Sequence, residues 1–546
     1  MKFTMRIVFA HLLWSTFASA GCYEPNVAHP LPDYDREDPL LRNAFALIDV
    51  GLALAVADAE FDTTSFSVEI TSSKQTLWSR YHTARERNVS RPDIPQVNGD
   101  AVYRIASITK AFTVLGLLYQ HEANNLSLDD SIDKYIPELQ GEKGGSIPWK
   151  DITLRSLASQ LSGIPRECLF GFDQRCYSHK NLIDAVTSKQ PIFAPNQKST
   201  YSNVAYELIG VAVANVAKQS YESYIEDAIF KPLGMTRSYL SLPPDNVGVI
   251  PLGPHYWDID QGIQKPTGGI YSSSNDLSKF LRYVLTHYNG ITSALNWIHS
   301  LSPSEGLNSF YGTPWEVFHT DKILSKCQRT VRFITKGGGV PLYTSIIITA
   351  PEYDLGFTIL VAGNAKLLDK IQEIVTVDAI RGAESVAIQQ LQERYTGTYK
   401  STQPELNDSI TLLADHRGLV VKEFISNGTD FLKSPLALKL AGLRDGSQPW
   451  YLQVVPTLLY RNEEKEQGER WRFTAARERS NEDRGVWDEF CPANVDLPIN
   501  EVVFWRGNGD EGVTIELPGF KGAKLKRTTN GRTFQYSNEQ QDILEL

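Results

Sequence analysis

Apolar and polar positions along the first two thirds of the chain recur with the periods of helices. Four runs carry apolar residues at helical spacing, at 106–122, 149–167, 202–220 and 272–288. A mostly apolar run at 38–58 and an amphipathic run at 366–382 also have helical length. Capping residues support two of these helices: Thr153 is expected to cap the second, and the serines from 272 cap the fourth.

Strand-like patterns accompany these helices. Residues 65–73 and 76–82 alternate like a strand pair, and residues 329–335 and 342–364 predict strands joined by a turn at 351–354. A helix-rich block together with these strands predicts an α+β fold with a mostly antiparallel sheet.

The pattern changes after about residue 389. From there on, short strand-like runs are separated by turn residues and charges, at 394–401, 409–424, 450–461, 469–478 and 501–507. This texture predicts a small all-β sandwich or barrel. We therefore expect one domain over residues 21–388 and a second, β-rich domain over residues 389–546. The composition, with 42% apolar and 22% charged residues, is that of a globular protein.

The first twenty residues have the features of an export signal. Lys2 and Arg6 precede an apolar run at 7–17, and residues 18–20 form an A-x-A cleavage site. We expect cleavage after residue 20 and a secreted, extracellular protein, since no later segment has the length of a membrane span. The formal net charge is −10, and cleavage removes two basic residues. This acidic balance disfavours nucleic acid and anionic membranes as partners.

All five cysteines lie after the predicted cleavage site, where an oxidising compartment favours disulfides. Cys168 and Cys176 are close in sequence and are expected to close one loop, and the odd count leaves at least one free thiol. No C-x-x-C pair is present, so we expect no zinc cluster and no metal cofactor. Four N-x-S/T sequons are candidate glycosylation sites, at Asn88, Asn125, Asn407 and Asn427.

Ser107 and Lys110 form an S-x-x-K motif at the start of a predicted helix. Residues three apart on a helix share a face, so the lysine amine lies close enough to take the serine proton. A lysine in this role must be neutral, which burial or a neighbouring cation achieves by lowering its pKa. Helix capping is the alternative role for Ser107. A second S-x-x-K, at 131–134, lies in a short polar segment beside two aspartates, and we interpret it as a cap or turn.

The second motif is Tyr201-Ser202-Asn203, immediately before an apolar helix. Tyr201 could act as a phenolate base or proton relay, and Asn203 could hold the lysine or a substrate amide. The same tripeptide recurs at 536–538 among polar residues, where we interpret it as a solvated tail.

The third motif is Lys336-Gly337-Gly338-Gly339 at the end of a predicted strand. Glycines allow a substrate to approach the backbone, whose N–H groups can then serve as an oxyanion hole. A similar K-G-G at 143–145 follows no strand, and a simple glycine turn is the alternative for both.

With its three motifs in this order, the chain resembles the serine β-lactamase and penicillin-binding-protein superfamily. The resemblance is strongest to class C-type β-lactamases and related esterases, and it covers roughly residues 44–382. It is carried by four longer segments, at 102–139, 152–167, 200–240 and 268–281. It implies an antiparallel sheet flanked by helices plus an all-helical subdomain. The β-rich tail is similar to small β-domains appended to some members, and secreted fungal β-lactamase-like proteins share this layout.

The resemblance also implies roles for the motif residues. Ser107 would be the acylated nucleophile, Lys110 its partner base, and Tyr201 a second base or proton shuttle. Asn203 would donate a hydrogen bond to the substrate, and Lys336 would polarise Tyr201. The backbone N–H groups of Ser107 and Gly339 would form the oxyanion hole. The implied chemistry is acyl transfer from a small ester, amide or lactam, without metal or organic cofactor.

One departure shifts the expected substrate. True β-lactamases usually carry K-T-G where this chain has Lys336, Gly337 and Gly338, so a hydroxyl that would help to hold a β-lactam carboxylate is missing. We therefore favour an esterase, amidase or transacylase over a true β-lactamase. A catalytically silent relative with a binding or assembly role is the alternative. Carbohydrate binding by tail tryptophans is a third hypothesis, although core packing explains them as well; they are Trp450, Trp471, Trp487 and Trp505.

Overall fold

The computed structural model describes residues 22–23, 28–168, 178–293, 295–324, 329–440, 450–477, 500–506 and 513–530. The predicted signal peptide, Cys176, Trp487 and the tripeptide at 536–538 lie outside these residues. The chain divides into two compact units, Leu31–Val386 and a second formed by Met1–Pro30 with Ala387–Leu546.

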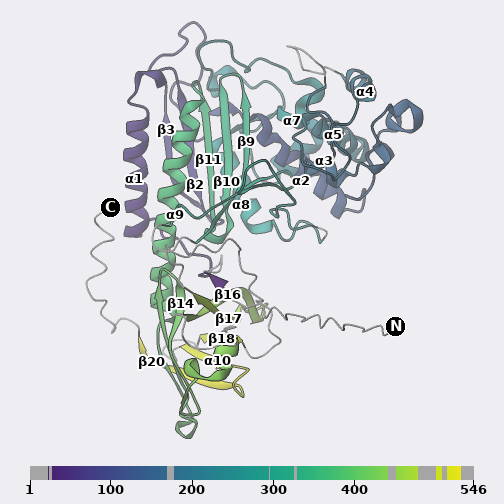
Figure 1. Ribbon diagram of the computed structural model, residues 1–546. Coiled ribbons are helices and arrows are strands. Elements are labelled where there is room, and N and C mark those ends of the chain that lie inside the picture. The colour runs from purple at the N-terminus through teal and green to yellow at the C-terminus, as the bar shows by residue number, and fades with distance from the viewer. Residues whose placement is uncertain are drawn as a thin grey trace, which may run out of the picture. The chain divides into compact units, whose positions relative to one another are not determined.

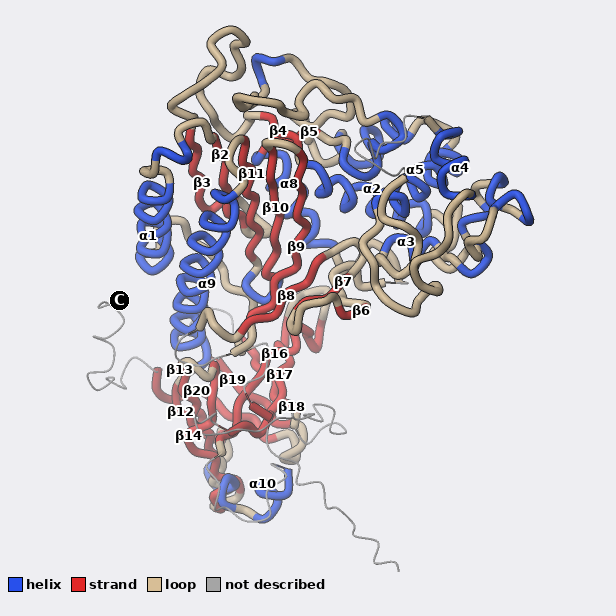
Figure 2. The backbone as a smooth tube through the Cα atoms, turned by 45° about the horizontal axis from the view of Figure 1, so that its top comes forward, coloured by secondary structure: helices blue, strands red, loops and turns tan. Residues whose placement is uncertain are grey.

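An antiparallel sheet forms the centre of the first unit (Figure 2). Its strand order is β3-β2-β11-β10-β9-β8-β7-β6. The strands are β2 Ser65–Thr71, β3 Thr76–His82, β6 Ser302–Pro303, β7 Ser309–Tyr311, β8 Glu316–Thr320, β9 Val331–Val340, β10 Tyr343–Ala350 and β11 Leu355–Ala362. A separate short pair joins β4 Val102–Arg104 to β5 Tyr271–Ser273. The predicted α+β fold with an antiparallel sheet is confirmed.

Helices cover both faces of this sheet because its strands are apolar on both sides. Helices α1 (Pro39–Ala55) and α9 (Lys366–Tyr395) lie along one face (Figure 1), where Phe45 and Ile371 belong to one buried cluster with the sheet. Helix α8 (Ser274–His287) packs on β2 and β11 and contributes Phe280 to a different cluster. Burying both faces in this way fixes the register of the central strands.

A helical block lies on the β9 side of the sheet (Figure 1). Its helices are α2 Thr109–Glu122, α3 Leu154–Ala158, α4 His179–Thr187, α5 Asn203–Ala217, α6 Tyr221–Ile225 and α7 Lys265–Gly268. Two differ from the sequence prediction. The helix predicted at 106–122 begins with a separate 3-10 turn, Ala106–Ile108. Thr153 caps α3 as expected, but α3 is short because Gln160 adopts a φ of +64°, which a right-handed helix cannot include.

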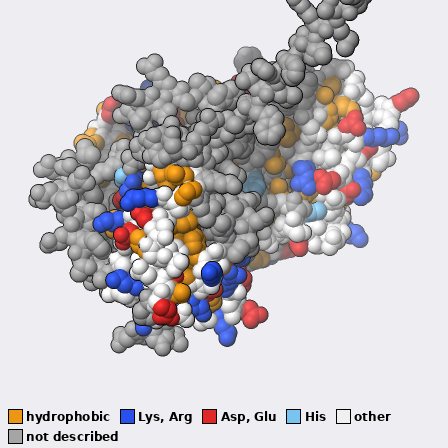
Figure 3. Space-filling view, turned by 60° about the horizontal axis from the view of Figure 1, so that its bottom comes forward, with side chains coloured by type: hydrophobic (Ala, Val, Ile, Leu, Met, Phe, Trp, Pro, Cys, Tyr) orange, Lys and Arg blue, Asp and Glu red, His pale blue; other side chains and the backbone are white. Residues whose placement is uncertain are grey.

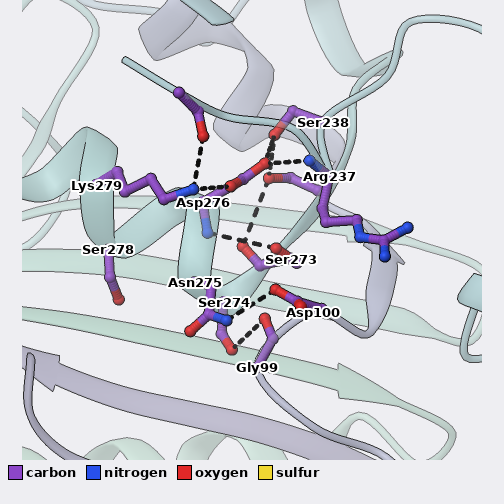
Figure 4. Close-up of polar contacts among 12 residues, drawn as sticks. Gly99, Asp100, Arg237, Ser238, Ser273, Ser274, Asn275, Asp276, Ser278 and Lys279 are labelled. Carbon is purple, nitrogen blue, oxygen red and sulfur yellow. Dashed lines mark hydrogen bonds and ion pairs between the residues drawn. The ribbon is translucent and has the colours of Figure 1, made fainter.

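A polar network anchors the N-terminus of α8 (Figure 4). The Asp276 carboxylate is 1% exposed and accepts hydrogen bonds from the Arg237 N–H at 2.6 Å and the Ser238 hydroxyl at 3.0 Å. Lys279 Nζ lies 2.8 Å from its other oxygen. Ser273 caps the helix by accepting from the Asp276 N–H. The network fixes the chain just after α7, which contacts the site described below.

The second unit is a closed β-barrel. Eight antiparallel strands pair in chain order, and the pairing of β20 with β12 completes the ring. They are β12 Gly397–Ser401, β13 Ser409–Asp415, β14 Gly418–Ser426, β16 Tyr451–Asn462, β17 Gln467–Arg477, β18 Glu501–Arg506, β19 Val513–Leu517 and β20 Ala523–Asn530. A small additional strand, β15 (Thr429–Asp430), pairs with β14, and α10 spans Pro435–Leu440. Of the two predicted architectures, sandwich or barrel, the structure has the barrel.

Apolar side chains fill the barrel, as is usual for eight strands. Tyr399, Trp471 and Phe504 are at most 1% exposed and belong to one cluster, so Trp471 is a core residue rather than a sugar-binding surface. The N-terminal strand β1 (Cys22–Tyr23) pairs with β17, although the sequence prediction placed these residues in the first domain. In the view of Figure 3, acidic and basic side chains are interspersed over the described surface.

Replacing Asp276 by Ala is expected to lower the free energy of unfolding by roughly 2–4 kcal/mol, because a buried N–H and a hydroxyl lose their acceptor. Urea unfolding followed by tryptophan fluorescence measures this. Asp100→Ala is the control: Asp100 is exposed and accepts from the Asn275 side chain, so its loss should cost about 0.5 kcal/mol or less. Equal effects of the two changes would contradict the assigned role of Asp276.

Candidate active site

The three sequence motifs meet where the starts of α2 and α5 approach β9. Ser107 lies in the 3-10 turn that leads into α2 and is partly exposed, whereas Lys110 is fully buried. Lys110 Nζ is 2.9 Å from Ser107 Oγ and donates to the Thr267 carbonyl of α7 at 3.0 Å. The lysine is therefore held against the serine from two sides.

The turn that carries Ser107 is held in an unusual conformation. Ala106, which precedes the serine, has a φ of +45°, in a region that costs a residue with a Cβ about 1 kcal/mol or more. Strand β9 runs tightly against this turn: a Cβ on Gly338 would lie 2.2 Å from the Ile105 carbonyl oxygen and 3.0 Å from the Ser107 nitrogen. Only glycine permits this approach, which brings the glycine segment to the serine.

Tyr201 is surrounded by cations. Lys110 Nζ lies 5.1 Å and Lys336 Nζ 5.3 Å from the centre of its ring, and the Arg166 guanidinium carbon lies at 5.0 Å. Burial by itself would raise the pKa of the Tyr201 hydroxyl, but the charges of Lys110 and Lys336 outweigh it and lower the pKa to about 8. A phenol with this pKa is ionised in part near neutral pH and can exchange a proton.

The pKa values of Lys110 and Lys336 are shifted in opposite directions. Burial lowers the pKa of Lys110 below its ordinary value; Tyr201 opposes this shift and the charge of Lys336 adds to it. Burial would lower the pKa of Lys336 as well, but the Glu316 carboxylate and Tyr201 raise it above the ordinary value. Lys110 is thus suited to accept a proton, and Lys336 remains a permanent cation.

Asn203 begins α5 with its side-chain amide turned toward a carboxylate. Its Nδ2 donates to Glu167 Oε1 at 2.7 Å, while its buried Oδ1 has no hydrogen-bond partner among the described atoms. One N–H of the amide group that the sequence analysis assigned to the substrate is therefore bonded to Glu167. Arg166 Nε lies 3.0 Å from the same Glu167 oxygen.

Several site residues carry no signal in the sequence. Glu316 on β8 places Oε1 2.6 Å from Lys336 Nζ, and its Oε2 accepts the Gly337 N–H at 3.1 Å. Glu207, one helical turn after Asn203 on α5, is fully buried, and burial raises its pKa to about 8. Arg166 and Glu167 are neighbours in one loop segment, and Glu316 lies on β8 far along the chain. Only spatial proximity to a motif residue identifies them.

The second copies of the S-x-x-K and K-G-G motifs have surroundings that differ from those of the first copies. Ser131 donates to Asp133 at 2.6 Å and Lys134 to Asp130 at 2.8 Å, so the second S-x-x-K forms a polar turn, as predicted. The second K-G-G lies in and after a 3-10 turn, Gly141–Gly144. Neither lies among the site residues described above.

Other predicted sites are only partly covered. Cys168 is buried and disulfide-bonded, but Cys176 lies outside the described residues, so this pairing stays a prediction. Asn125, Asn407 and Asn427 are exposed and Asn88 is partly exposed, and their glycosylation also stays a prediction.

In the described part of the chain, no cluster of three or more His, Cys, Asp or Glu side chains is arranged to hold a metal ion. None of the helices described there is long and apolar enough to span a membrane.

Gly338→Ala is expected to lower the free energy of unfolding by about 1–3 kcal/mol, since its Cβ would overlap the Ile105 carbonyl. Gly339→Ala is the matched control, because a Cβ at Gly339 meets nothing within 4 Å. Its melting temperature should equal that of the wild type. Thermal unfolding compares the two, and a Gly338→Ala protein as stable as Gly339→Ala would exclude the tight approach of β9 to the turn.

Comparisons with known proteins cover both parts of the chain. The family model described as "Beta-lactamase" matches residues 56–376, and one described as "Beta-lactamase-like-like, C-terminal domain" matches residues 387–529. The "Probable hydrolase clz13" of Cochliobolus lunatus is 27% identical, over 100% of this chain and 97% of the relative. The "Probable hydrolase M10" of a Phoma species is 28% identical, over 95% and 94% respectively.

Among solved structures, the class C beta-lactamase of Rhodobacter sphaeroides is similar in fold. It has a TM-score of 0.50 and 20% sequence identity, over 61% of this chain and 98% of that one. The family model and the two hydrolase relatives cover the sheet, the helical block and the three motifs, and they support a serine hydrolase-type function. By its sequence over residues 56–376, the chain belongs to the beta-lactamase family.

Proposed function

We propose that the protein is a secreted serine hydrolase or acyltransferase that acts on a small ester, amide or lactam through an acyl-enzyme on Ser107. The main support is the 2.9 Å contact between Ser107 Oγ and Lys110 Nζ beside Tyr201, whose pKa is lowered to about 8. Two relatives that match nearly the whole chain carry the name of hydrolases. Secretion rests on the signal-like residues 1–20.

The proposed reaction has two steps. Ser107 Oγ attacks the substrate carbonyl carbon and passes its proton to Tyr201, directly or through Lys110, while the Ser107 and Gly339 N–H groups stabilise the negative oxygen. The bond to the leaving group breaks as that group receives the proton from Tyr201. Water, or a second alcohol or amine, then attacks the acyl ester and gives its proton to Tyr201. The bond between the acyl carbon and Ser107 Oγ breaks, Oγ takes the proton from Tyr201, and the acid, ester or amide product leaves. No metal or organic cofactor enters these steps.

The substrate is proposed to be an ester or amide rather than a β-lactam antibiotic. Gly337 stands where a threonine hydroxyl would help to hold a β-lactam carboxylate, and the neighbouring Glu316 carboxylate accepts its N–H. An esterase, amidase or transacylase needs no such hydroxyl.

A fluorophosphonate probe should label wild-type protein at Ser107, and Ser107→Ala should lose labelling and at least about 1000-fold in the turnover of active esters. Intact-mass spectrometry locates the adduct. Ser131→Ala, in the second S-x-x-K, is the control and should label like wild type. Absence of labelling in the wild type would favour the catalytically silent alternative, and equal labelling of Ser107→Ala would rule out Ser107 as the nucleophile.

The value of kcat/KM should rise with pH and level off above about 8, because Tyr201 must lose its proton to act as a base. Lys336→Met removes a charge that lowers the Tyr201 pKa, so the rise should move to higher pH. Lys366→Met changes an exposed lysine remote in sequence and should leave the profile unchanged. A profile that is the same in Lys336→Met would show that Tyr201 is not the titrating base.

A further inference from the structure

The Glu316 carboxylate occupies the side of the site formed by Lys336 and Gly337. One oxygen lies 2.6 Å from Lys336 Nζ, and the other accepts the Gly337 N–H at 3.1 Å. The Glu316 backbone is fixed by the pairing of β8 with β9, in which it lies opposite Thr335, and its carbonyl accepts from the Thr335 hydroxyl at 2.9 Å. The sheet therefore fixes the position of the Glu316 backbone.

The ammonium group of Lys336 is held by neighbouring groups. It donates to Glu316 at 2.6 Å and to the Gly337 carbonyl at 2.9 Å, and the centre of the Tyr201 ring lies 5.3 Å away. The lysine side chain is 1% exposed, whereas that of Glu316 is 24% exposed. A ligand that approaches this side of the site therefore meets the carboxylate before the ammonium.

A second carboxylate lies near Asn203. Glu167 accepts from the Asn203 amide at 2.7 Å and is 19% exposed, with Arg166 as its partner. Lys336 and Arg166, two of the cations beside Tyr201, are thus each paired with a carboxylate, whereas Lys110 is fully buried against Ser107 and Thr267. An incoming carboxylate therefore meets a like charge at close range, which opposes its binding.

We propose that Glu316 is a specificity-determining residue that excludes substrates with a carboxylate beside the reacting acyl group. The preferred substrate class is then esters that are uncharged at this position. The inference rests on the proposed function, since it concerns which acyl donors reach Ser107. It also relates the K-G-G motif to Glu316: the Glu316 carboxylate occupies the place beside Lys336 and Gly337 where a substrate carboxylate would need to bind.

Two acetyl esters that differ by one charge test this proposal, 3-acetoxybenzoate and its methyl ester. The wild type should hydrolyse the methyl ester with a kcat/KM at least about 10-fold higher, and Glu316→Gln should reduce that preference by about 10-fold. Glu316→Asp, which keeps the charge, should retain a preference for the methyl ester. An unchanged ratio in Glu316→Gln, or a wild type without preference, would overturn the proposal.

Glu352→Gln is the matched control. Glu352 pairs with Arg332 at 2.7 Å, near the other end of the same strand β9. Glu352→Gln should therefore leave the ratio of kcat/KM for the two esters unchanged.

The pH profile of Glu316→Gln is a second readout, since the charge of Glu316 raises the Tyr201 pKa. Its removal should shift the acid limb of kcat/KM to lower pH, which a purely structural role would not do.

The wild type provides a test that needs no variant. Raising ionic strength from roughly 0.01 to 1 M shortens the screening length from about 30 to 3 Å, so the preference for the neutral ester should narrow. A preference independent of salt would overturn the charge-based explanation.

Fluorophosphonate labelling separates this proposal from the proposed serine hydrolase function. An unlabelled Ser107 overturns both, whereas a labelled Ser107 with no charge preference overturns only the role of Glu316.

Discussion

The site depends on placing two buried lysines against one tyrosine. Lys110 and Lys336 come from different layers of the domain, and both lie within 5.3 Å of the centre of the Tyr201 ring. Two ammonium groups buried so closely would repel each other, and the protein resolves this by making them chemically unequal. Lys336 keeps its proton because Glu316 and Tyr201 compensate it, and its charge favours the loss of a proton from Lys110 and from Tyr201.

The surrounding fold supplies the rigidity that this arrangement needs. Strand β9 approaches the turn before α2 so closely that Gly338 admits no Cβ, and Thr267 on α7 fixes the far side of Lys110. The segment after α7 is held in turn by the buried carboxylate of Asp276 at the start of α8. Helix, strand and loop are thus tied to one another around the serine.

The β-barrel has its own core and its own closed hydrogen-bond ladder. Its strands pair in chain order, and aromatic residues such as Trp471 and Phe504 fill its interior. Trp471 and Phe504 therefore serve the packing of the barrel. The short strand β1 joins the barrel from the opposite end of the chain, which no local pattern in the sequence indicates.

The sequence by itself determined the fold class and the local motifs. Helical spacing places Lys110 beside Ser107 within a single turn, and Thr153 and Ser273 mark the starts of α3 and α8, because these relations involve neighbouring residues. Tertiary structure decided which charges surround the motifs. Glu316 reaches Lys336 through the β8–β9 register, and Glu167 reaches Asn203 across 36 positions of chain. Such contacts follow from the packing of distant segments, and a single charged residue gives no pattern from which to predict them.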